Sequence, residues 1–214
     1  MQQLTRLFRQ LSYQLSERRA FDLILDSLLY PVCIQAHEDY SISNPVENYK
    51  ISASEITILK QVLIRIGDIA ETGHDPLGDL FMEFISGGHN GQYFTPMELC
   101  KFIAAISIGL RESEDNARMH DPACGSGRMF LAAAQSDKKL HFFGTDIDMI
   151  CCRMAAANMI LHNLVADISC GDTLTMRYSH VYMIRRSPFN NFPVLRILKY
   201  VRTEDREWQR HRQH

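Results

Sequence analysis

Four short segments of the sequence combine glycine, carboxylate and aromatic residues in an order suited to holding a polar organic ligand. The most distinctive is the glycine turn Asp121–Gly127, of sequence Asp-Pro-Ala-Cys-Gly-Ser-Gly, which precedes the helix-forming run Phe130–Ala134. Gly125 and Gly127 can adopt positive φ and leave room for backbone N–H groups to approach a ligand. We therefore expect a strand, a glycine turn and a helix here, with the ligand at the turn.

Two carboxylates follow the glycine turn, each at the end of a segment expected to form a strand. Asp146 lies in the segment 141–148, 19 residues beyond Gly127. That separation is close to the one at which an acid bonds ribose hydroxyls in nucleotide-binding βαβ units. Asp172 follows a shorter predicted strand, 167–170, where a carboxylate can accept from an exocyclic amine. Each acid taken alone is equally well explained as a carboxylate that caps a strand end.

The fourth candidate segment, Tyr93–Pro96, ends where a helix is expected to begin. Thr95 suits the N-cap, Pro96 suits the first helical position, and Glu98 would complete a capping box. The N-terminus of such a helix presents free N–H groups and a positive partial charge to a polar ligand. A well-capped helix without a ligand accounts for the same residues equally well.

The elements expected to position these groups alternate between strand and helix. Strands are predicted before the glycine turn and at 141–148, 167–170 and 181–184, and helices after the turn and at 151–161. This alternation predicts an α/β, Rossmann-like core with a doubly wound, mostly parallel sheet. Ligands of such sheets bind at the carboxyl ends of the strands. We therefore expect the groups that follow all four predicted strands to lie there: the glycine turn, Asp146, Asp172 and the segment 185–190 after the fourth strand.

The rest of the chain is predicted to flank this core. Residues 1–74 form an N-terminal helical region, in which Ser52 or Ser54 caps a helix that stops near Gly73. Residues 75–190 form the core, which begins with a further helical stretch at 79–85 that stops at the glycines 87 and 88. Residues 191–214 are expected to form a basic helix, Val194–Val201, and a tail.

The composition fits a globular protein, with 46% apolar and 22% charged residues. No apolar run approaches the roughly 18 residues of a membrane span, and the first residues lack a secretion signal, so we expect a cytoplasmic protein without a membrane partner. The six cysteines contain no Cys-x-x-Cys pair, which argues against a structural zinc site or any other metal. Residues 185–214 hold eight Lys and Arg against three Asp and Glu, which suits either a polyanionic partner or a solvated terminus.

Two common nucleotide motifs are excluded by the turn itself. A dinucleotide fingerprint needs a third glycine, and Phe130 occupies that position. A P-loop needs Gly-Lys followed by Ser or Thr, and no such triplet follows the turn.

Taken together, the four segments resemble the adenine-N6 DNA methyltransferases, especially the modification subunits of type I restriction-modification systems. The resemblance rests on Gln92–Pro96, Asp121–Gly127, Gly144–Asp148 and Gly171–Leu174, in this order, and covers about half of the chain. It implies S-adenosylmethionine (AdoMet) as cofactor. It also implies double-stranded DNA with a flipped-out adenine as substrate, and a specificity subunit or other restriction-modification subunits as partners.

The resemblance assigns a role to each part of the site. Asp146 would bond the ribose hydroxyls, with Ile147 against the adenine ring of the cofactor. Asp172 would accept from the adenine amine, with Leu174 packed nearby. The other cofactor-binding residues would surround the methionine end: Tyr93, Phe94, Thr95, Pro96, Asp121, Pro122, Ala123, Gly125 and Gly127.

The catalytic loop departs from the family pattern, in which Asn-Pro-Pro and an aromatic residue follow the fourth strand. Here Pro188 and Phe189 are kept, Ser187 replaces a proline, and Arg186 stands where Asn or Asp is expected. Arginine has five donors and no acceptor, so it cannot receive the hydrogens of the target amine. Its presence would slow transfer by about 10²–10³. A shifted alignment could use Asn190 or Asn191, although neither precedes a Pro-Pro pair.

Three functions follow from these residues. The first is an active DNA adenine-N6 methyltransferase. The second is a catalytically impaired or truncated AdoMet-binding homologue that acts as a binding or regulatory module. The third is a methyltransferase for a small molecule or a protein. Only about 25 residues follow Phe189, so a minimal or truncated family member is expected.

Overall fold

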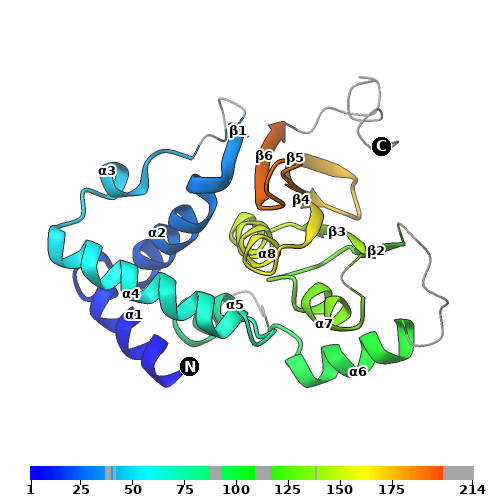
Figure 1. Cartoon of the computed structure of the whole chain (residues 1–214), viewed down its shortest axis with the longest axis horizontal. Coiled ribbons are helices and arrows are strands. Elements are labelled where there is room, and N and C mark those ends of the chain that lie inside the picture. The colour runs from blue at the N-terminus through cyan, green and yellow to red at the C-terminus, as the bar shows by residue number, and fades with distance from the viewer. Residues whose placement is uncertain (37–39, 41, 87–92, 109–116, 138, 200–214) are drawn as a thin grey trace.

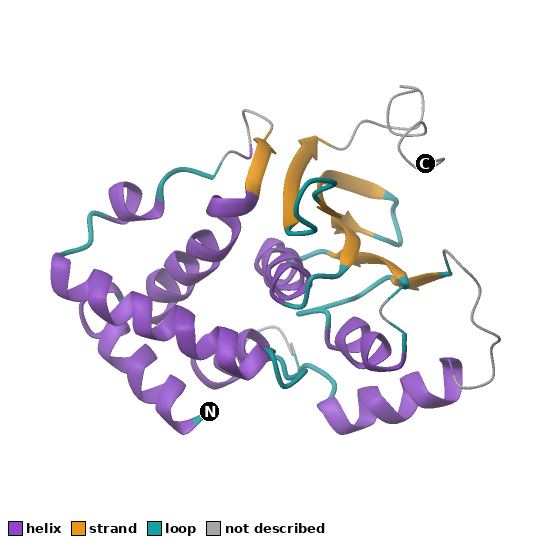
Figure 2. Ribbon diagram, in the orientation of Figure 1, coloured by secondary structure: helices purple, strands orange, loops and turns teal. Residues whose placement is uncertain are grey.

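The computed structural model describes residues 1–36, 40, 42–86, 93–108, 117–137 and 139–199. A helical region built by the first part of the chain lies beside an α/β core, and α8 (Met149–Leu161) lies between the helical region and the sheet (Figure 1). Figure 2 shows the same division as a mainly helical half and a half that holds the strands. Within the described residues, no helix is long and apolar enough to cross a membrane.

The N-terminal helices form where apolar residues recur on one face. In α4 the Ser52 hydroxyl accepts from the backbone N–H of Glu55, and the Glu55 carboxylate accepts from the N–H of Ser52, which confirms the predicted cap. Gly73, at φ 78°, follows the helix where its stop was predicted. The predicted stop at residues 87 and 88 lies outside the described part of the chain. The helical elements of this region are α1 (Gln2–Leu15), α2 (Glu17–Leu29), the 3-10 turn η1 (Tyr30–Val32), α3 (Pro45–Tyr49), α4 (Ala53–Ala70), α5 (Pro76–Leu80) and the π-helical turn η3 (Phe81–Ile85).

The sheet has six strands in the order β1-β6-β5-β4-β3-β2. The unit β2–β3–β4 is parallel, because α7 (Arg128–Ser136) and α8 (Met149–Leu161) supply its crossovers. β5 is antiparallel to both of its neighbours, and β1 pairs parallel with β6. The strands are β1 (Cys33–Ala36), β2 (Arg118–Asp121), β3 (His141–Asp146), β4 (Val165–Asp172), β5 (Arg177–Arg186) and β6 (Pro193–Lys199).

The direction of β5 corrects the expected continuation of a parallel sheet. β5 contains the predicted fourth strand, but only residues 173–176 separate it from β4. A parallel neighbour needs a crossover of about a dozen residues, whereas four residues suffice for a hairpin. The short connection therefore forces β5 to run back along β4.

The predicted helix Val194–Val201 is also wrong, because residues 193–199 form β6. Leu195 and Ile197 are buried while Arg196 between them is exposed, which is the period of two expected for a strand. β6 pairs with β1 from the N-terminal part of the chain, so segments from both ends of the chain meet in one sheet.

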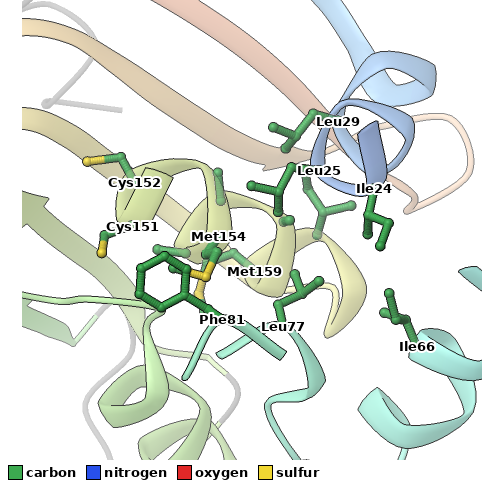
Figure 3. Packing of buried hydrophobic residues seen from close by; sticks show 14 of the residues in the cluster. Ile24, Leu25, Leu29, Ile66, Leu77, Phe81, Cys151, Cys152, Met154 and Met159 are labelled. Carbon is green, nitrogen blue, oxygen red and sulfur yellow. The ribbon is translucent and has the colours of Figure 1, made fainter. Parts of the chain in front are cut away.

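The helical region and the α/β core share one hydrophobic interior. Met154 and Met159 of α8 are fully buried and belong to one hydrophobic cluster with residues from α2, α4 and α5, among them Leu25, Ile66 and Leu77 (Figure 3). Each fully buried side chain of this size contributes about 1.5–3 kcal/mol to folding. Packing between the helical region and α8 therefore helps to stabilise the sheet.

Candidate functional site

The glycine turn after β2 has a geometry that requires glycine at two positions. Gly125 and Gly127 have φ values of 53° and 84°, and the Asp121 carboxylate accepts from the N–H of Ala123 at 3.0 Å. A Cβ on Gly125 would lie 2.9 Å from the ring of Phe94. The backbone of the turn and the aromatic ring of the preceding segment thus lie in direct contact.

Phe130 occupies the position at which a dinucleotide fingerprint has its third glycine, and its side chain packs in the core. Its ring is fully buried, 5.2 Å from the ring of Phe142, and it fills the space beside Gly144 of β3. The turn is further fixed to β3 by a bond of 2.9 Å from Cys124 N–H to the Thr145 carbonyl. α7 therefore packs on the sheet through an aromatic ring and a glycine on the strand.

Asp146 lies at the end of β3, directly beside the turn. Its carboxylate accepts from the N–H of Gly125 and from the N–H of Asp148, both at 2.9 Å. A carboxylate has about four acceptor sites, so two remain for a ligand. Burial raises the pKa of Asp146, and the two N–H bonds partly oppose that rise.

Asp172 ends β4 and caps the hairpin that leads to β5. Its carboxylate accepts from the Thr175 hydroxyl at 2.8 Å and from the N–H groups of Leu174 and Thr175. These bonds lower the pKa of Asp172. The hydroxyl of Thr173, in the same hairpin, donates to the Pro122 carbonyl at 2.8 Å, which joins the hairpin to the glycine turn.

One cavity of about 840 Å³ lies where these groups meet, at the carboxyl ends of β2, β3 and β4. Of the residues predicted for the cofactor, nine line it: Tyr93, Phe94, Pro122, Ala123, Gly125, Asp146, Ile147, Asp172 and Leu174. The other four do not line the cavity but lie within two residues of a lining residue in the chain: Thr95, Pro96, Asp121 and Gly127.

Further residues line the cavity that the sequence analysis did not assign to it. They are Asp148, Met149, Cys151, Gly171 and Thr173. Asp148 caps α8 by accepting from the N–H of Ile150 at 2.9 Å. An acid immediately before a helical run after a strand is the pattern that could have identified it. Burial raises the pKa of the Cys151 thiol, which therefore stays neutral.

The charge of the cavity limits which kinds of ligand can bind there. Among the described residues that line it, three are carboxylates and none is Lys or Arg. A polyphosphate would meet repulsion here, whereas a ligand with hydroxyl, amine and cationic groups would find acceptors.

The predicted capping box at Thr95 and Glu98 is replaced by a different arrangement. α6 (Met97–Ile108) begins after Pro96, whose carbonyl accepts from the N–H groups of Leu99 and Cys100. Glu98 instead forms an ion pair of 3.0 Å with Lys101.

The residues predicted for catalysis lie away from the cavity. Arg186 ends β5 and donates to the Asn163 carbonyl at 3.0 Å, just before β4 begins. Asp172 ends the same β4, so nearly the full strand, roughly 25 Å, separates the two. Ser187, Pro188 and Phe189 belong to the turn between β5 and β6, and the Phe189 side chain is 95% exposed. The expectation that all four groups share one edge of the sheet is therefore wrong for this loop.

The parallel β2–β3–β4 unit with its glycine turn and acidic cavity has the fold of the class I S-adenosylmethionine-dependent methyltransferases. A crystal structure from Listeria monocytogenes assigned to that class is similar, with a TM-score of 0.53, 13% sequence identity, and coverage of 88% of this chain and 60% of that one. Residues 75–191 match the N-6 DNA Methylase family. The match covers more than half of the chain, and the chain belongs to this family.

Curated relatives of the chain include a methylase subunit of a type I restriction enzyme and a type II methyltransferase. The type I restriction enzyme MpnII methylase subunit of Mycoplasma pneumoniae is 27% identical over an alignment of 146 residues, which covers 62% of this chain and 26% of that protein. The type II methyltransferase M.MamI of Microbacterium ammoniaphilum is 31% identical over an alignment of 101 residues, which covers 41% of this chain and 28% of that protein. The chain thus spans about a quarter of the length of these relatives.

Proposed function

We propose that this chain binds AdoMet in the cavity at the ends of β2, β3 and β4, and that it acts in the N6 methylation of adenine in DNA within a restriction-modification system. The observation that carries the proposal is the convergence of the glycine turn, Asp146 and Asp172 on one cavity of about 840 Å³. Membership of the N-6 DNA Methylase family supports the same reading.

The residues present fit the cofactor. Asp146 has two acceptor sites left for ribose hydroxyls, and the adjacent Ile147 is 73% exposed at the cavity, where an adenine ring could cover it. Asp172 would accept from the adenine amine, and Phe94 with the glycine turn would border the methionine end. Bound AdoMet would supply an electrophilic methyl group on a sulfonium, whose positive charge suits an acidic cavity.

Transfer to adenine also requires an acceptor that holds the target amine. In this chain the loop assigned to that task lies at the opposite edge of the sheet, and it carries an arginine at the key position. That observation favours a second candidate function: a member of the family that binds AdoMet without transferring its methyl group, and acts as a binding or regulatory module.

The partners follow from the proposed function. Double-stranded DNA with a flipped adenine would be the substrate, and a specificity subunit or other restriction-modification subunits would supply sequence recognition. With such a substrate and such partners, we propose a cytoplasmic location for the protein.

Two measurements on the purified chain separate the candidates. Calorimetry with AdoMet tests binding, and incubation of unmethylated duplex DNA with AdoMet carrying a labelled methyl group tests transfer. Label recovered on adenine N6 supports the methyltransferase, and AdoMet binding without label supports the binding module. A chain that binds no AdoMet would contradict both.

A further inference from the structure

Asp75, at the start of α5, is a buried carboxylate outside the cavity. The residue is 2% exposed, and its side chain faces the back of the glycine turn, which it contacts through Ser126 and Arg128. It caps α5 by accepting from the N–H of Gly78 at 2.7 Å. A single cap of this kind would use only one of its acceptor sites.

The other acceptor sites of Asp75 bind groups around the turn. One oxygen accepts from the Ser126 hydroxyl at 2.5 Å and from Arg128 Nε at 2.7 Å. The other accepts from Asn158 Nδ2 of α8 at 2.8 Å, in addition to Gly78. With four donors, the carboxylate is saturated. It therefore holds the turn, the start of α7 and the middle of α8 at once.

The same network reaches the aromatic segment at the cavity. Arg128 also pairs with Asp79, and its guanidinium lies 5.6 Å from the centre of the Phe94 ring. Burial lowers the pKa of Arg128, whereas the negative charges of Asp75 and Asp79 together raise it by a larger amount. The pKa is therefore raised overall, and the residue stays charged. Phe94 in turn covers Gly125, where even a Cβ would not fit.

Asn158 closes the network from the side of the sheet. The amide group that donates to Asp75 also donates to the Ser126 carbonyl at 2.8 Å. Both the side chain and the backbone of Ser126 are thus bound, and the glycines on either side of it have positive φ. The conformation of the turn is set from behind by these contacts.

We propose that Asp75 is a positioning residue for the cofactor site: it fixes the glycine turn from the helical side, so that docking of α5 controls AdoMet affinity. This inference rests on the proposed function for its readout in AdoMet affinity, but not for its structural part. The chain offers a matched control in Asp26, a carboxylate of α2 that accepts from Arg153 of α8 at 2.7 Å and from the Tyr49 hydroxyl at 2.9 Å. Asp26 also joins the helical region to the core, but away from the turn.

The experiment compares Asp75→Asn with Asp26→Asn in the full chain. An asparagine keeps the shape but offers only one acceptor oxygen, so at least two of the four bonds of Asp75 are lost. Hydrogen exchange without cofactor is expected to speed up at least tenfold in peptides covering 122–131 for Asp75→Asn, and to stay within twofold there for Asp26→Asn. Calorimetry is expected to show AdoMet affinity about tenfold weaker for Asp75→Asn only. The milder Ser126→Ala should weaken it severalfold.

The experiment separates a failure of the positioning role of Asp75 from a failure of the proposed function. Equal exchange at 122–131 in both variants, or unchanged exchange in Asp75→Asn, would overturn the positioning role even if the wild type binds AdoMet. If the wild type binds no AdoMet, the proposed function fails, while the exchange comparison still decides whether Asp75 holds the turn. Should Asp75→Asn not fold, Ser126→Ala decides in both assays: unchanged exchange and unchanged affinity would overturn the proposal.

Discussion

The Asp146 carboxylate accepts a hydrogen bond of 2.9 Å from the backbone N–H of Gly125. This bond ties the end of β3 to the turn after β2, so two elements 21 residues apart act as one wall of the cavity. A substitution at Gly125 or at Asp146 should therefore also affect the other residue.

The two glycines Gly125 and Gly67 give opposite predictions for the same substitution. Gly125→Ala puts a Cβ 2.9 Å from the Phe94 ring on a backbone with φ of 53° and should destabilise the protein by about 1–3 kcal/mol. Gly67→Ala, inside α4 with no atom within 4 Å of the new Cβ, should stabilise it by about 0.5–1 kcal/mol. Urea unfolding measures both, and a stability loss of equal size at the two sites would contradict the assigned geometry.

The separation of the cavity from the turn between β5 and β6 predicts a contrast in ligand binding. Ile147→Ala should weaken AdoMet binding several-fold, because Ile147 lines the cavity. Phe189→Ala should leave the dissociation constant within about twofold, because Phe189 lies beyond the far end of β4. Calorimetric titration of both variants checks this, and a larger loss at Phe189 would show that the loop reaches the cavity.

His180 of β5 should make stability depend on pH. The side chain is fully buried, and its ring stacks on the ring of Tyr40 with 4.1 Å between the two ring centroids. Burial lowers the pKa of His180 to about 4. The unfolded chain, with an ordinary pKa near 6.5, then binds the proton more tightly, so stability is full above about pH 6.5 and falls as the pH drops toward 4. The loss is at most about 3 kcal/mol.

His180→Phe keeps the aromatic ring of His180 but cannot titrate. Urea unfolding at several pH values between 7 and 4.5 should therefore show a shallower pH dependence for this variant than for the wild type. Identical slopes for the two proteins would remove His180 as a source of the effect.

Much of the cavity could be predicted from local patterns. The glycine turn, the acid after β3 and the acid after β4 each follow a strand of the parallel unit, and strand ends meet at one edge of such a sheet. A serine cap for α4 at Ser52 or Ser54 could also be predicted, because a cap and the helix it begins are neighbours in the sequence, and the structure places the cap at Ser52. In these cases the local signal and the tertiary arrangement agree.

The rest of the structure depends on contacts between distant residues or on the length of the connection between two strands. The short connection 173–176 determines the direction of β5, and hence the position of Phe189, but strand pattern alone does not encode direction. Residues 193–199 form a strand because β5 and β1 flank them. The role of Asp75 arises from donors 51, 53 and 83 residues away in the chain, so no motif pointed to it.

Calorimetric titration of the purified chain with AdoMet, repeated with Asp146→Ala, tests the central claim most directly. We expect one binding site per chain in the wild type and an affinity at least tenfold weaker in Asp146→Ala, because the alanine removes both the proposed ribose acceptor and the bond to Gly125. Asp68→Ala, which alters an exposed carboxylate of α4, should bind like the wild type. No binding by the wild type, or equal affinity in Asp146→Ala, would contradict the assignment of this cavity to AdoMet.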